Sequence, residues 1–331
     1  MDSRSSSRLS LFSVRGCRVL RARSATQATL RSSVAPAVPL WYASHHGYLS
    51  RSARLVIIGV AWLYTVWVVA RAAPCEQDEA YHNFADSRCM CGCIPNFNDV
   101  ASNFPFLVVG GFGIAVLAHP SLADLSTTVI SEDEQRAWLA FYFGIALTAF
   151  GSAYYHWRPT SSTLVWDRLP MTVAFVSLFS ALLHEYAGFP ASMTLWPLLA
   201  VGVGSVVMWA ASGDLRLYIL VQFVPLVSTL LLVILFPPVY SHAGLLLAGL
   251  GLYAAAKVRA RACILYVCMV GCASHCSLAH GGLFLLQFTE AKDKAIFTLT
   301  GGVVSGHTLK HLLAACVPAV VLYMLHTRSV L

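Results

Sequence analysis

The chain has 331 residues, of which 57% are hydrophobic and only 11% are charged. A soluble domain would carry about 25% charged residues, so the composition excludes an ordinary soluble protein and favours an all-α membrane protein. The formal net charge of +7 belongs to the first 54 residues, which hold nine arginines and one acid; the remainder carries thirteen basic and fourteen acidic side chains. We therefore expect an integral membrane protein with no nucleic-acid partner.

Residues 1–54 are rich in Arg and Ser and contain no apolar core. That composition is closer to an organelle transit peptide than to a secretory signal. Two alternatives stay open, namely a disordered tail and upstream sequence joined wrongly to the reading frame. In each case the segment lies outside the folded domain.

Eight hydrophobic segments follow, and most approach the roughly 20 residues that a membrane-spanning helix needs. They cover residues 55–70, 100–118, 137–156, 168–187, 191–211, 216–236, 242–256 and 302–325. Short connections between consecutive segments favour antiparallel neighbours in a bundle. The sequence therefore predicts a seven-transmembrane helical bundle in residues 74–331, preceded by an extra N-terminal transmembrane segment at 55–73.

Counting membrane crossings places the most unusual polar residues on one side, which we call the loop side because it holds the polar loop 71–98. His156 ends one helix there, Asp167 opens the next, and the last helix starts there with His307 and His311. The count holds only if residues 258–301 add no net crossing. Lys and Arg are more frequent on the loop side, so the positive-inside rule favours a cytosolic orientation for it.

Imidazole and carboxylate groups are costly inside a membrane, so they indicate a functional site. His307 and His311 are four residues apart, and a helix places both on one face. With His156 they offer three neutral imidazoles, which leaves a fourth position for water at a catalytic zinc. We predict a zinc site formed by His156, His307 and His311.

Two further residues have both a structural and a catalytic interpretation. In the structural interpretation, Asp167 caps a helix or pairs with Arg158 or Arg168. In the catalytic interpretation, it is a general base that takes a proton from water and then an acid that gives it to the leaving amine. Ser152 lies one helical turn before His156. Its hydroxyl either bonds back to its own helix or orients water and stabilises an oxyanion.

The remaining polar clusters have simpler interpretations. The C-x-C-x-C run at 89–93 lacks a fourth ligand at zinc-finger spacing, so we interpret the cysteines as structural or incidental thiols. The other histidines mostly flank helix ends or lie in the tail.

Three motifs together resemble the alkaline ceramidase family, which belongs to a superfamily of seven-helix membrane hydrolases. They are S-x-x-x-H at 152–156, D-x-L-P-M at 167–171 and H-x-x-x-H at 307–311. Two longer stretches resemble its ceramidase-like branch in bacteria and lower eukaryotes. These are Y-H-N-F-A-D-S-R with I-P-N-F-N-D-V-A-S-N-F-P-F, and L-T-G-G-V-V-S-G-H-T-L-K-H.

The resemblance implies zinc on the three histidines, with Ser152 and Asp167 beside it and seven core helices. It also implies hydrolysis of the N-acyl bond of ceramide or phytoceramide to a sphingoid base and a fatty acid. Animal members carry a calcium site near the N-terminus. Loop 76–99 supplies carboxylates without that pattern, so a modified calcium site is a further hypothesis; the carboxylates are Glu76, Asp78, Glu79 and Asp86.

Residues 258–287 interrupt the resemblance. Deleting them joins Y-A-A-A-K to F-T-E-A-K-D-K-A-I-F-T-L-T-G-G, which restores the continuity of the family. Val258-Arg259 can be encoded by G-T-G-A-G and the closing Leu-Gln by C-T-G-C-A-G, both similar to splice sites. We interpret these residues as an insertion or a translated intron.

Two rival functions remain open. One is a hydrolase of the same superfamily that acts on phospholipid acyl esters or lipid anchors. The other is a lipid-binding membrane receptor with a structural zinc and no turnover. The endoplasmic reticulum, the Golgi or another organelle membrane is the expected location.

Overall fold

The computed structural model describes residues 49–119, 130–240 and 292–329. Seven helices in these ranges are long and apolar enough to cross a membrane, which confirms the predicted all-α membrane bundle. They are α3 (Arg51–Arg71), α4 (Phe97–Ala101) with α5 (Phe104–Ala118), α6 (Glu132–Trp157), α7 (Ser161–Ala187), α8 (Ala191–Ser212), α9 (Arg216–Leu235) and α14 (Gly306–Thr327). Two short helices, η1 (Glu79–His82) and α13 (Asp293–Leu299), lie outside these spans.

Several predicted segments fall outside the described residues. These are the tail up to residue 48, the spanning segment at 242–256 and the insertion at 258–287. The extra N-terminal helix is present as α3, and it starts earlier than predicted. The Ser50 hydroxyl caps it by accepting a hydrogen bond from Ala53 N at 3.2 Å, so Arg51 and Arg54 belong to the helix and not to the tail.

Helix α7 also starts earlier than the hydrophobic pattern predicts. Thr160 and Thr163 form a capping box, in which each hydroxyl accepts a hydrogen bond from the other residue's backbone N–H, at 3.2 and 3.1 Å. The polar run that follows Thr160 is therefore the first turn of the helix and not a loop. Asp167 lies inside α7, nearly two turns after the cap, so the prediction that it opens the helix is wrong.

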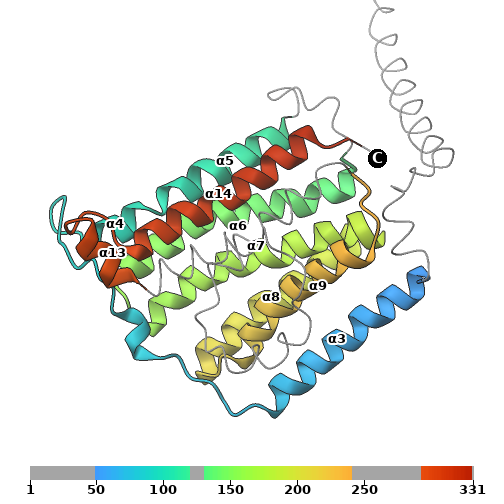
Figure 1. Cartoon of the computed structure of the whole chain (residues 1–331), viewed down its shortest axis with the longest axis horizontal. Coiled ribbons are helices and arrows are strands. Elements are labelled where there is room, and N and C mark those ends of the chain that lie inside the picture. Colours follow the sequence, from blue (N-terminus) through green and yellow to red (C-terminus); the bar gives the residue numbers. More distant parts are fainter. Residues whose placement is uncertain (1–48, 120–129, 241–291, 330–331) are drawn as a thin grey trace, which may run out of the picture. The chain divides into compact units, whose positions relative to one another are not determined.

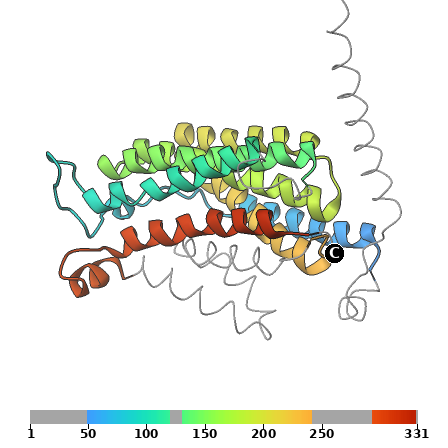
Figure 2. The same ribbon diagram turned by 90° about the horizontal axis from the view of Figure 1, so that it is seen from above.

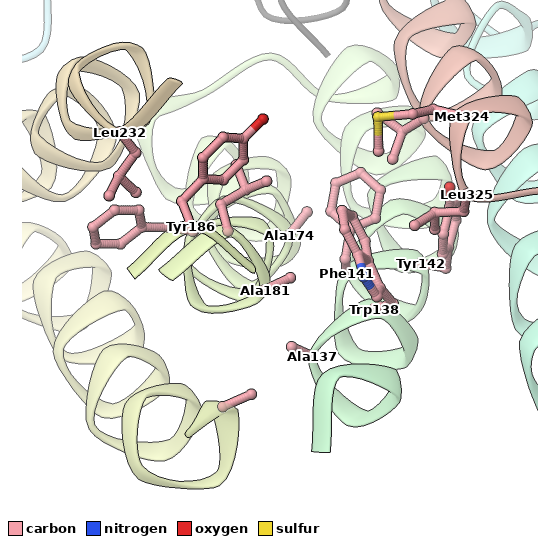
Figure 3. Packing of buried hydrophobic residues seen from close by; sticks show 14 of the residues in the cluster. Ala137, Trp138, Phe141, Tyr142, Ala174, Ala181, Tyr186, Leu232, Met324 and Leu325 are labelled. Atoms are coloured by element: carbon pink, nitrogen blue, oxygen red, sulfur yellow. The ribbon is translucent and has the colours of Figure 1, made fainter. Parts of the chain in front are cut away.

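Helices α6 and α7 form the centre of the bundle. Helix α6 packs against α5 and α7, α7 also packs against α8 and α9, and α14 lies against α5 (Figures 1 and 2). Large aromatic side chains fill the space between α6 and α14, where Trp138 and Tyr142 lie beside Met324 and Leu325 (Figure 3). The Tyr142 hydroxyl donates to Pro318 O at 3.0 Å, so this buried polar group has a partner on α14.

Two glycines allow the close approach of α6 and α7. A Cβ on Gly144 would lie 2.7 Å from Ala174 N, and a Cβ on Gly151 would collide with Trp166 O. Both positions therefore exclude any side chain unless the helices separate. Because Gly151 precedes Ser152, and Trp166 precedes Asp167, the two helix backbones come together next to the two predicted catalytic residues.

The end of the bundle opposite the loop side is closed by a buried ion cluster. Arg328, just after α14, donates to Glu134 of α6 at 2.7 Å and to Glu185 of α7 at 3.5 Å. Trp138 Nε1 donates to the same Glu134 carboxylate at 2.9 Å. Removing one charge from such a buried group would leave the others uncompensated, so the cluster fixes the end of α14 against α6 and α7.

Candidate metal centre

The three predicted histidines meet at the loop side of the bundle. His156 lies in the last turn of α6, while His307 and His311 lie on the first two turns of α14. One ring nitrogen from each lies within 4.8 Å of those of the other two, and the imidazole ring centroids are pairwise 4.7 Å apart. All three side chains are buried. The structure therefore confirms that the triad gathers on one side.

This donor set fits a metal ion. Nδ1 of His156 is buried and has no hydrogen-bond partner among the described residues, although an unpaired polar atom in such a place is costly. A bound cation would satisfy it, and three buried neutral imidazoles are suitable ligands for zinc and for other first-row metals. The triad can hold a metal ion, and the geometry does not select which one.

The N-terminus of α14 is held by a buried carboxylate on α4. The hydroxyls of Ser305 and Thr308 donate to Asp99 Oδ1, at 2.8 and 2.6 Å. Ser305 also caps the helix by accepting from Thr308 N at 2.9 Å. Because His307 lies between these two residues, Asp99 fixes the helical turn that carries it.

Two residues beside the triad were not among those predicted. Ser102 Oγ lies 2.7 Å from Nδ1 of His311, and Asp293 Oδ1 accepts a hydrogen bond from His307 N at 2.8 Å. Both belong to stretches that carry the family resemblance. Their contacts with the triad join segments about 200 and 14 residues apart, and no spacing in the sequence indicates them.

Phe84 covers the triad from the loop between α3 and α4. Its ring centroid is 4.6 Å from that of His156 and 4.8 Å from that of His307. The next residue is fixed in place, because Ala85 N donates to Asp293 Oδ2 at 2.9 Å. The loop thus places an aromatic side chain over the histidines, which limits the access of water from the loop side.

The predicted catalytic residues both lie on helices of the site. Ser152 is buried one turn before His156, and within the described ranges it makes no hydrogen bond to its own helix. Thr148, one turn earlier, does make that bond, to Gly144 O at 2.9 Å. Asp167 is buried on α7 and is not the helix cap, which is Thr160.

An apolar cavity of about 100 Å³ lies between α6, α7, α9 and α14. Its lining includes Thr148, Met171 and Ala314. These residues lie about one helical turn from Ser152, Asp167 and His311, on the side toward the middle of the membrane. The cavity therefore lies inside the bundle, about one helical turn from the site.

The acidic residues of loop 76–99 do not form a second metal site. Among the described residues, the histidine triad is the one group of three or more potential ligands that meet. Asp78 caps η1 by accepting from Ala80 N at 3.0 Å, and Asp86 pairs with Arg88 at 2.7 and 2.8 Å. Burial opposes ionisation of Asp86, but the hydrogen bonds from Arg88 outweigh it and lower the pKa of the carboxyl. The calcium hypothesis gains no support.

The same loop contains a disulfide between Cys89 and Cys93, while Cys91 is a free, exposed thiol. The structure thus pairs two of the cysteines that the sequence left open.

A scan against protein-family models finds no match, and no curated protein or solved structure matches the chain.

Proposed function

We propose that the protein is a zinc-dependent hydrolase of the alkaline ceramidase type, which cleaves the N-acyl bond of ceramide or phytoceramide in an organelle membrane. The observation that carries the proposal is the buried triad of His156, His307 and His311 at one end of the membrane bundle. The motif resemblance supports the choice of zinc and of an amide substrate. The apolar cavity of about 100 Å³ inside the bundle supports a lipid, because it can receive part of an acyl or sphingoid chain.

The chain's own residues have defined tasks in this reaction. When bound, zinc supplies a Lewis acid for the amide carbonyl and makes water a better nucleophile. Asp167 takes the proton from the attacking water and returns it to the leaving amine, so that a carboxylic acid and a free amine are the products. The Ser152 hydroxyl donates to the oxygen on which negative charge develops. Phe84 keeps bulk water from the histidines.

The test combines metal content with product analysis on purified protein. We expect about one zinc per chain, and release of long-chain base and fatty acid in equal amounts from a ceramide mixture. Asp167→Asn should lower turnover by about 10²–10⁴-fold with the metal retained, and Ser152→Ala by about 10²-fold. His307→Ala should lose both the metal and the activity. His184→Ala, which changes a histidine at the opposite end of α7, is the control and should keep both.

The assay also separates the rival functions. Release of fatty acid from phospholipid esters, without release of long-chain base from ceramide, would favour the ester hydrolase over the ceramide amidase. Tight zinc binding without turnover on any lipid would favour the receptor. Ceramide cleavage that survives in metal-free His307→Ala would refute the proposed site.

A further inference from the structure

We infer that Ser102 on α4 is a positioning residue, whose hydroxyl fixes the ring state of His311 and thereby sets the metal affinity of the site. The inference uses only the metal-binding part of the proposed function. It does not depend on which lipid is cleaved, or on whether any lipid is cleaved.

The first step concerns the hydroxyl proton. Ser102 Oγ donates to Asp99 O at 3.2 Å, since a carbonyl oxygen can only accept. We assign the single hydroxyl proton to this bond, so that the contact with His311 Nδ1 at 2.7 Å uses an oxygen lone pair. Ser102 then accepts a hydrogen bond from the Nδ1–H of His311. The ring state is assigned from these partners.

The second step concerns the other ring nitrogen. A neutral imidazole with a proton on Nδ1 has its free lone pair on Nε2. Nε2 of His311 is therefore the atom available to a metal ion, and the ring is already in the required tautomer before the ion arrives. A partner on the second nitrogen also restricts rotation of the ring and raises the basicity of the ligand.

The third step concerns the support of Ser102 itself. It is buried at the end of α4, and Asn103 Nδ2 donates to the same Asp99 carbonyl at 2.7 Å. The side chain of Asp99 meanwhile binds the hydroxyls of Ser305 and Thr308 at the start of α14. The Asp99 carbonyl thus holds the Ser102 and Asn103 side chains at the end of α4, and its carboxylate ties α4 to α14, which places the Ser102 hydroxyl beside His311.

Two of the three histidines differ in the hydrogen bonding of Nδ1. In the described part of the chain, Nδ1 of His156 has no partner, whereas Nδ1 of His311 has Ser102. Among these two ligands, His311 is therefore the one whose orientation is set in advance by the protein. A change at Ser102 should act on metal affinity through His311.

The test measures metal affinity of the full-length protein in detergent by competition with a chromogenic zinc chelator. We expect Ser102→Ala to weaken zinc binding by about 10–100-fold, the usual effect of removing such an outer partner. Ser102→Thr keeps the hydroxyl and should restore most of the affinity. Ser205→Ala is the matched control, because it removes a buried helical hydroxyl that bonds to Gly202 O at 2.7 Å, away from the site. Its affinity should equal that of the unmodified protein.

Two further measurements separate a positioning role from a purely structural one. The thermal midpoint of metal-free Ser102→Ala should stay close to that of the metal-free unmodified protein. In ¹⁵N-histidine NMR spectra of the unmodified metal-loaded protein, one ligand should carry its proton on Nδ1 and bind through Nε2, and this signal should change in Ser102→Ala. Unchanged zinc affinity in Ser102→Ala, or a His311 ring bound through Nδ1, would overturn the inference. Loss of lipid turnover with normal affinity would count against the inference while leaving the proposed function in place.

Discussion

His82 lies next to the site, and its surroundings disfavour protonation of its ring. Its Nδ1 lies 2.9 Å from the Tyr155 hydroxyl and its Nε2 lies 3.1 Å from Ser161 Oγ. Burial lowers the pKa of His82 below its ordinary value of 6.5; nearby Glu79 opposes this shift and Arg168 adds to it. These surroundings therefore favour the neutral form of the ring.

This shift predicts a pH dependence of stability. Below pH 6.5 the unfolded chain binds a proton at His82 more readily than the folded chain does. The stability that the neutral His82 ring contributes to the fold is therefore complete above pH 6.5, and it is lost as the pH falls toward the lower pKa of the folded protein. We expect the thermal midpoint to fall between pH 7.5 and pH 5.5 by more in the unmodified protein than in His82→Gln. Thermal unfolding of both proteins with chelator present checks this, and parallel curves would contradict it.

At the scale of single residues, the sequence predicts the ligands better than their surroundings. Helical spacing predicts His307 and His311 as ligands, and its place at the end of an apolar segment predicts His156. Ser102 and Phe84 give no such signal, because a serine and a phenylalanine in a loop region are ordinary until the fold brings them to a histidine ring.

At the scale of elements, the apolar pattern locates helices but misplaces their polar first turns. Helix α7 begins at Ser161 because Thr160 and Thr163 cap each other, whereas the hydrophobic run starts later. The start of α3 at Arg51 has the same cause in Ser50. Side-chain capping, rather than hydrophobicity, decides where these helices begin.

The contact between α6 and α7 gives a prediction at this scale. Gly151→Ala places a methyl group against Trp166 O and should lower the thermal midpoint, since overpacking typically costs about 1–3 kcal/mol. It should also weaken zinc binding, because separating the helices displaces His156. Thermal unfolding and chelator competition measure the two effects.

Gly204→Ala is the matched control on α8, where an added Cβ meets nothing within 4 Å. We expect this variant to be as stable as the unmodified protein or slightly more so, because Ala is the better helix former by about 1 kcal/mol. Equal behaviour of the two variants would show that the α6–α7 contact tolerates a larger residue.

At the scale of the whole molecule, two features of the loop side favour opposite compartments. Its excess of Lys and Arg favours the cytosol, whereas the disulfide between Cys89 and Cys93 favours an oxidising lumen. We give the disulfide more weight and expect the metal-binding end to face the lumen.

A glycosylation reporter tests this orientation. An Asn-x-Thr acceptor inserted beside the exposed Gly92 should receive a glycan when the protein is synthesised with endoplasmic-reticulum microsomes. An acceptor inserted at the connection between α7 and α8, on the opposite side, should remain unmodified. The reverse pattern would restore the cytosolic orientation predicted by charge.

Helix α14 is joined to α6 at both of its ends, by the histidine triad at one and by Arg328 with Glu134 at the other. The rise of an α-helix puts His156 and Glu134 about 33 Å apart along α6. When the metal leaves, the hydrogen bonds from Ser305 and Thr308 to Asp99 still hold this end of α14, and Arg328 holds the other end. We expect the metal-free protein to keep the same bundle with α14 in place, and to rebind its ion without refolding in the membrane.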